Sequence, residues 1–212
     1  MSTYDYILLD WDGNLAKTLD LWLESCRQPF EKRGLKLTDR QIGASFGGLK
    51  THLMELGIHD IDEFINEMDA ISVTMMPHAE LYPDALAVLE ELHARGKKLA
   101  LVTTSFHDTV KALLDKYSMN ELFDVIVTHH DTQNHKPHIE PLEKALGLLG
   151  GAKEKAVMIG DSDKDLGAAL NFGIDSILFY PSEHEKYYDL SELKKHKPTH
   201  VVDDFRKILE IV

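Results

Sequence analysis

The sequence predicts an α/β protein, in which a doubly wound parallel sheet is interrupted by an inserted helical segment. Residues 7–9 form a short, continuous apolar run, which is typical of a parallel strand buried on both faces. Beyond Leu81, short apolar runs alternate with segments of helical periodicity, as they do in βαβ units. Between these parts, residues 16–79 show helical patterns and no convincing strand. These three observations together predict the fold class.

The inserted segment is expected to contain several helices. In the first, apolar side chains recur at helical spacing from Leu19 to Phe30. Thr38 and Gln41 have the spacing of a capping box, which predicts the start of a second short helix. A third helix is expected over residues 52–56, and a long amphipathic stripe predicts a fourth that ends at Pro77.

The remaining chain reads as alternating strands and helices. We expect strands at residues 98–102, 123–128, 156–159, 176–179 and 199–202. Helices are expected at residues 85–93, 110–117, 139–149 and 205–211. A further helix is expected to follow residues 160–165 and to end near Gly173. Right-handed crossovers would make this sheet doubly wound. We therefore predict a core domain of residues 1–15 and 80–212, and a helical cap domain of residues 16–79.

Composition limits the classes of function. With 212 residues, of which 43% are hydrophobic, the chain can bury a core. Its net charge of −13 argues against sequence-independent binding to nucleic acid and against an anionic membrane surface. The single cysteine, Cys26, excludes an internal disulfide framework, and we interpret it as a packed thiol. No leader or long apolar run is evident, so we expect a cytoplasmic protein, either a monomer or a weak homodimer.

Polar side chains follow the ends of several predicted strands. Asp10 and Asp12 follow the first strand, Thr103 the second and Asp161 the fourth, while Lys136 lies in the loop after the third. The carboxyl ends of parallel strands meet at one edge of a sheet, so these groups are expected to converge. Carboxylates facing a hydroxyl and an ammonium suit a cation that lies beside a phosphoryl group. Mg²⁺ prefers a few carboxylate or carbonyl oxygens together with the phosphate of a substrate, so we expect Mg²⁺ here.

Four motifs occur in a familiar order. They are Asp10-Trp11-Asp12-Gly13, the strand end at Thr103, Lys136-Pro137, and residues 160–165 with their three aspartates. In order and spacing they resemble the motifs of the haloacid dehalogenase superfamily, over essentially the whole chain. The helical insert resembles the small α-helical cap of the branch that contains phosphoglycolate phosphatases and β-phosphoglucomutases. The resemblance implies a Rossmann-like core with this cap inserted after the first strand.

The resemblance also implies a role for each motif residue. Asp10 would be the nucleophile that becomes an aspartyl phosphate, and Asp12 the general acid and base, with its backbone carbonyl facing the metal. Thr103 would hydrogen-bond a phosphoryl oxygen, and Lys136 would offset negative charge. Asp161 would bind Mg²⁺ directly, and Asp165 directly or through water. The metal ligands expected from the resemblance are therefore Asp10, Asp12, Asp161 and Asp165.

Residues beside the motifs are expected to contact the substrate. These candidates are Gly13, Thr104, Ser105 and Lys50. Lys50 belongs to a stretch, residues 45–50, that is similar to the cap loop which reaches into the site in this branch. A solvated lysine at a helix end is the alternative. Asn14, Lys17 and Thr104 depart from the family's usual residues, which leaves the substrate open.

We interpret the chain as a Mg²⁺-dependent phosphatase that hydrolyses a small soluble phosphate monoester through an aspartyl phosphate, similar to phosphoglycolate phosphatase. A sugar phosphomutase of the β-phosphoglucomutase type is the alternative enzyme, and a non-catalytic phosphate-binding module is the alternative of another class. We expect a small-molecule partner and neither nucleic acid nor membrane. His129, His130, His135 and His138 are interpreted as polar loop residues near the site rather than as zinc ligands.

Overall fold

Six parallel strands form one sheet in the computed structural model, which describes residues 4–45 and 48–212. The strands are β1 (Tyr6–Leu9), β2 (Lys98–Val102), β3 (Val125–Val127), β4 (Ala156–Gly160), β5 (Asp175–Phe179) and β6 (His200–Val202). Their order across the sheet is β3-β2-β1-β4-β5-β6, so β1 lies between β2 and β4. The predicted doubly wound α/β fold is confirmed. The order reverses at β1, which makes the carboxyl end of this strand the expected binding crevice.

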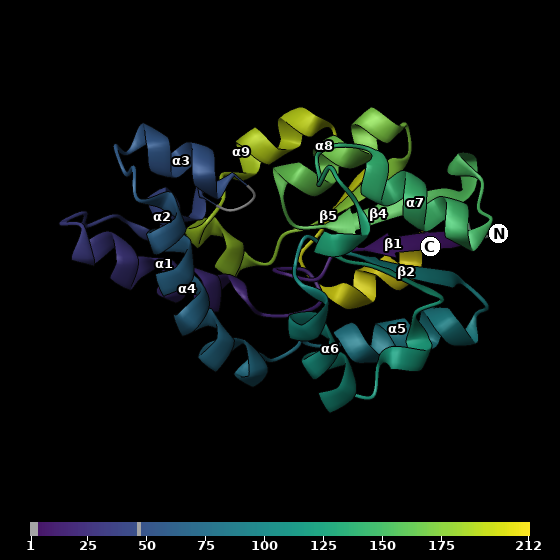
Figure 1. Cartoon of the computed structure of the whole chain (residues 1–212). Helices are drawn as coiled ribbons and strands as arrows, with labels where there is room; N and C mark the ends of the chain where they lie inside the picture. Colours follow the sequence, from purple (N-terminus) through teal and green to yellow (C-terminus); the bar gives the residue numbers. More distant parts are fainter. Residues whose placement is uncertain (1–3, 46–47) are drawn as a thin grey trace.

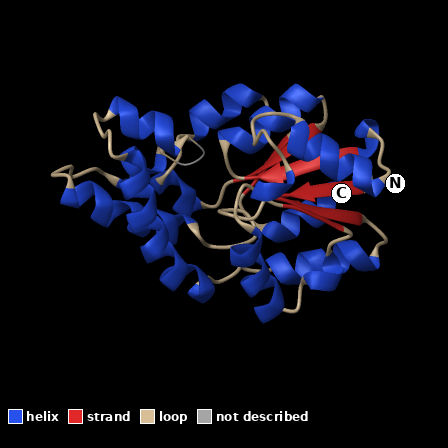
Figure 2. Cartoon of the chain, viewed as in Figure 1, coloured by secondary structure: helices blue, strands red, loops and turns tan. Residues whose placement is uncertain are grey.

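Alternate residues of the central strands face opposite layers of helices. Leu8 packs with α7 (Glu140–Leu149) and α8 (Asp163–Phe172). Ile7 and Leu9 pack on the other face, with α5 (Ala85–Ala94), α6 (His107–Lys116) and α10 (Ile208–Ile211). Figures 1 and 2 show the sheet between these two groups of helices. Both faces are buried, which is why the strands read as continuous apolar runs rather than alternating ones.

Four helices lie beyond the strand ends to which the arrows point in Figure 2. They are α1 (Leu19–Lys32), α2 (Asp39–Gly43), α3 (Leu49–Glu55) and α4 (Ile61–Met75), and we call them the cap. The predicted capping box is present, because the Thr38 hydroxyl accepts from the Gln41 N–H and the Gln41 side chain accepts from Thr38. A hydrophobic cluster joins the cap helices through Phe30, Phe64 and Met68.

The chain enters and leaves the cap along two adjacent segments. Tyr82 N donates to Leu15 O at 3.0 Å, and Lys17 N donates to Glu80 O at 2.7 Å. The cap is also tied to the segment after β5, since Tyr187 packs in the cap cluster and Lys17 forms an ion pair with Glu183 at 3.2 Å. The division into domains 1–15 with 80–212 and 16–79 stays our proposal.

The bounds of several elements differ from the sequence-based expectation. β3 covers only Val125–Val127 instead of residues 123–128, because its pairing with β2 begins at Val125 and Thr128 already caps the 3-10 helix that follows. The third cap helix begins at Leu49 rather than at His52. The expected terminal helix over 205–211 is a 3-10 turn, Phe205–Lys207, followed by α10.

Within the described part of the chain, no helix has both the length and the apolar character needed to span a membrane.

Candidate active site

An ammonium group links the acidic residues at the strand ends. Lys136 Nζ lies 2.6 Å from Asp10 Oδ1, 2.6 Å from Asp165 Oδ1 and 2.9 Å from the carbonyl oxygen of Val102. Asp10 follows β1, Val102 ends β2, and Asp165 lies in the first turn of α8. The structure therefore brings the loop after β3 to the centre of the sheet edge, as the sequence predicted. Lys136 is buried, so all its donors are used within the protein.

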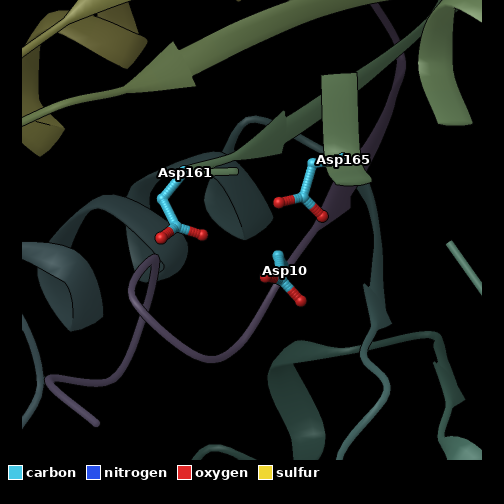
Figure 3. A group of neighbouring side chains, drawn as sticks. All are labelled: Asp10, Asp161 and Asp165. Carbon is cyan, nitrogen blue, oxygen red and sulfur yellow. The ribbon is translucent and has the colours of Figure 1, made fainter. Parts of the chain in front are cut away.

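Asp10, Asp161 and Asp165 form a buried carboxylate group. One oxygen from each lies within 4.8 Å of the others, and Figure 3 shows the three side chains gathered from the end of β1, the turn after β4 and the start of α8. Asp165 Oδ2 accepts hydrogen bonds from the backbone and hydroxyl of Ser162. Asp161 Oδ2, in contrast, is buried and has no partner among the described residues.

The negative charges of these three carboxylates are not balanced by nearby positive charge. Burial, followed by repulsion from Asp165, raises the pKa of Asp10, although Lys136 opposes the rise. Burial, and then repulsion from Asp165 and Asp10, raises the pKa of Asp161 well above its usual range. Burial alone would lower the pKa of Lys136, but Asp10 and Asp165 outweigh it and raise that pKa. Three buried carboxylates thus face a single ammonium, and negative charge remains uncompensated.

A divalent cation fits this group. Its donors are hard carboxylate oxygens, which are the ligands that Mg²⁺ and Ca²⁺ prefer, and the partnerless Asp161 Oδ2 is one of them. The excess negative charge of the group requires a cation for the carboxylates to remain ionised together. The Asp12 carboxylate lies outside this group, so its expected metal contact through the backbone carbonyl stays a prediction.

Two glycines make room for the aspartates. A Cβ at Gly13, whose φ is +71°, would lie 2.3 Å from Asp161 Oδ2. A Cβ at Gly160 would lie 2.3 Å from Asp165 Cγ. Asn14 fastens the loop that contains Gly13, because its Nδ2 donates to Asp10 O at 3.0 Å. The expected contact of Gly13 with substrate is untested, but the residue clearly determines how closely the loop approaches Asp161.

Asp12 is held by three donors from two parts of the chain. Its Oδ1 accepts from Thr18 Oγ1 at 2.6 Å and from Trp22 Nε1 at 2.9 Å, and its Oδ2 accepts from Ser105 Oγ. Thr18 and Trp22 belong to the start of the cap, whereas Ser105 follows β2. The Asp12 carboxylate is therefore oriented jointly by the cap and the sheet.

The segment after β2 presents two residues to the site and buries a third. Thr104 and Ser105 line a cavity of about 720 Å³ between the sheet edge and the cap. Asp10, Asp12, Lys136 and Asp161 line the same cavity. Thr103 is buried beneath, and its Oγ1 accepts from the Ser105 N–H at 3.0 Å. The proposed bond from Thr103 to a phosphoryl oxygen stays a prediction.

Lys50 lies at the other side of this cavity. It is an exposed residue of α3 and lines the cavity, so the structure brings it to the site. Residues 46–47 of the expected cap loop lie outside the described residues. Lys50 is one of several lysines on the lining, and its contact with substrate remains a proposal.

The loop histidines form an aromatic wall rather than a metal site. His129 stacks on His135 with ring centroids 4.2 Å apart, and Phe106 packs against His129 at 4.8 Å. His129 and His135 line the cavity. Among the described residues, the one group able to hold a metal is the three aspartates. Cys26 is buried in the cap cluster, where burial raises the pKa of its thiol to about 12.

Sequence reasoning missed several residues of the site. Trp22 lies within the apolar stripe expected from Leu19 to Phe30, yet its indole N–H donates a hydrogen bond to Asp12. Tyr188, which follows β5, lines the cavity, and its side chain opposes the rise in the pKa of Asp161. The polar N–H of a tryptophan was the one available signal for Trp22, because buried indoles usually have a hydrogen-bond partner. Nothing local in the sequence indicated Tyr188.

Comparison with known proteins gives a family match over most of the chain. The model of the family "Haloacid dehalogenase-like hydrolase" matches residues 7–179. Pyrophosphatase PpaX of Halalkalibacterium halodurans is 30% identical over 220 residues, which cover 97% of this chain and 95% of that protein. The expected resemblance to this family is confirmed.

Solved structures share the fold. A predicted phosphoglycolate phosphatase from Haemophilus somnus 129PT superposes with a TM-score of 0.82 at 22% identity, covering 100% of this chain and 99% of that one. CbbY from Rhodobacter sphaeroides, solved in complex with phosphate, has a TM-score of 0.76 at 23% identity, covering 97% and 96% of the two chains. At these identities the likeness concerns the fold alone.

Proposed function

The chain belongs to the haloacid dehalogenase-like hydrolase family, and we propose that it is a Mg²⁺-dependent phosphatase that hydrolyses a small phosphate monoester through an aspartyl phosphate. One observation carries the proposal. A lysine ammonium and three carboxylates converge at the cavity floor, with the singly hydrogen-bonded Asp10 among them. This arrangement suits the transfer of a phosphoryl group to a carboxylate.

Asp10 is the nucleophile in this proposal. Lys136 holds its Oδ1, while Oδ2 accepts no hydrogen bond within the described part of the chain. An Asp10 oxygen forms a bond to phosphorus as the bond from phosphorus to the ester oxygen breaks, and the leaving alcohol departs. Lys136 offsets the repulsion between the carboxylate and the phosphoryl oxygens.

Asp12 moves the protons. Its carboxylic acid protonates the departing alkoxide, and its carboxylate then removes a proton from the water that attacks the aspartyl phosphate. Phosphate leaves and Asp10 is restored. The donors Thr18, Trp22 and Ser105 keep the Asp12 carboxylate in one orientation through both steps.

Asp10, Asp161 and Asp165 are the residues that would hold Mg²⁺. When bound, the cation supplies positive charge to the phosphoryl oxygens and to the carboxylates. We propose no partner beyond a soluble phosphate ester.

The test is release of inorganic phosphate from a panel of esters, with Mg²⁺ and with a chelator. The Asp10→Asn variant removes the nucleophile, and Asp163→Asn, on a half-exposed acid two residues from Asp165, is the matched control. Release that requires both Mg²⁺ and Asp10, and that persists in the control, supports the proposal. Isomerisation of a sugar phosphate without release would favour a phosphomutase, and inactivity in both assays would favour a binding module.

A further inference from the structure

The cavity above Asp10 has two ends of different chemistry. Asp10, Lys136 and Asp161 form the polar end at the sheet edge. Apolar side chains form the cap end, namely Leu19, Trp22, Cys26, Leu49, Ile65 and Met68. The whole space is about 720 Å³, within the range of sites that enclose a medium-sized organic ligand. A phosphoryl group at the polar end therefore leaves the apolar end to be filled by the rest of the substrate.

The cap end also contains an unpaired negative charge. Asp69 of α4 lines the cavity, and its carboxylate forms no ion pair or hydrogen bond within the described part of the chain. A second negative charge on the substrate would be repelled there. Lys164 on the lining is paired with Asp163 at 3.0 Å, and Lys136 is held by two carboxylates. Lys50, the lining lysine without an ion pair among the described residues, is exposed, so water screens its ammonium more strongly than the carboxylate of the half-buried Asp69.

We infer that the leaving alcohol of the substrate has an apolar body without negative charge, which packs against the cap end of the cavity. The inference rests on the proposed function and narrows it. It favours esters of apolar alcohols over phosphoglycolate and inorganic pyrophosphate, whose leaving groups are anionic. Burial of an apolar leaving group against Trp22, Ile65 and Met68 supplies the free energy by which the site discriminates these esters from substrates with anionic leaving groups.

The experiment compares benzyl phosphate with methyl phosphate, because the two leaving alcohols have similar acidity and differ mainly in apolar area. We expect kcat/KM for benzyl phosphate to exceed that for methyl phosphate by at least about tenfold. Ile65→Gln should reduce this ratio. Val73→Gln, on the same helix but 70% exposed, should leave the ratio unchanged.

A second arm uses phosphoglycolate and pyrophosphate. The wild-type protein should favour benzyl phosphate over both, and Asp69→Asn should raise kcat/KM for phosphoglycolate relative to benzyl phosphate by about fivefold. Equal activity on methyl and benzyl phosphate, or a preference for an anionic leaving group, would overturn the inference while Asp10-dependent release upholds the proposed function. If the protein released phosphate from none of the esters, both the inference and the proposed function would be overturned.

Discussion

The indole Nε1 of Trp22 donates a hydrogen bond to Asp12 Oδ1 over 2.9 Å. Trp22 belongs to the first cap helix and Asp12 to the loop after β1, so this bond joins the cap to the proposed acid and base. Asp12 Oδ1 also accepts from Thr18, at the start of the same helix. Any movement of α1 relative to the sheet would therefore change the surroundings of Asp12.

Replacing Trp22 should impair the proton transfers. Trp22→Phe keeps an aromatic ring but removes the donor, and hydrogen bonds to a charged group contribute about 1.5–3 kcal/mol. We expect kcat to fall by about tenfold or more, with a smaller loss than Asp12→Asn causes. Steady-state kinetics on one ester would measure this, with Met54→Gln, on an exposed cap residue, as the control. A kcat equal to that of wild type would show that the bond does not orient Asp12 for catalysis.

Lys136 should be essential to stability as well as to activity. Lys136→Met leaves Asp10 and Asp165 buried without their shared cation. Breaking a buried pair in this way costs about 3–5 kcal/mol of unfolding free energy. Lys98→Met is the control, because it breaks an exposed pair with Asp124, which is worth about 0–1 kcal/mol. Urea unfolding in the presence of a chelator should show a much larger loss of unfolding free energy for Lys136→Met than for Lys98→Met. Similar losses in the two variants would contradict a stabilising role for the buried Lys136 ammonium.

Removing one carboxylate should make the metal-free protein more stable. Asp161→Asn relieves repulsion in the group of Asp10, Asp161 and Asp165, and we expect a gain of about 1 kcal/mol or more in chelator. Mg²⁺ should raise the Tm of the wild type and raise that of the variant much less. Thermal unfolding with and without Mg²⁺ tests both points, with Asp163→Asn alongside. Equal Mg²⁺ shifts in wild type and Asp161→Asn would place the cation elsewhere.

His184 should make the protein sensitive to mild acid. Burial lowers its pKa to about 3, and its Nε2 forms a hydrogen bond with the Tyr82 hydroxyl at 2.8 Å. The unfolded chain binds a proton near pH 6.5 and the folded one does not, so stability falls as pH drops from 6.5 towards 3. The contribution is at most about 1.4 kcal/mol per pH unit. Unfolding free energies measured over this range should fall less steeply in His184→Gln. If the unfolding free energies of wild type and His184→Gln fell with pH at the same rate, His184 would be excluded as the cause of the acid sensitivity.

Gly13 and Gly34 permit a matched test of whether the loop after β1 must lie close to Asp161. Both have positive φ, +71° and +76°, but only a Cβ at Gly13 would collide with Asp161; at Gly34 nothing lies within 4 Å. Each Ala substitution should cost about 1–3 kcal/mol through backbone strain. Gly13→Ala should also abolish phosphate release, and Gly34→Ala should retain it. Equal activities would show that the loop after β1 can shift without harm.

Much of the fold could be predicted because its signals are local. The continuous apolar run at β1 and the capping box at Thr38 both appear where the sequence placed them. The boundaries of β3 could not be predicted, since the 3-10 helices on both sides depend on their own hydrogen bonds, such as the one between Thr128 and Asp131. Apolar periodicity does not distinguish a strand from its apolar flanks.

The sequence by itself determined the α/β order and the chemistry at the sheet edge. Asp10, Lys136 and Asp161 each follow a strand, and parallel strands bring their carboxyl ends together whatever the details of packing. Only the tertiary structure decided what surrounds them. The hydrogen bond from Trp22 to Asp12 and the position of Tyr188 beside Asp161 depend on how the cap and the segment after β5 pack against that edge. Such packing results from contacts between distant segments, which no local pattern encodes.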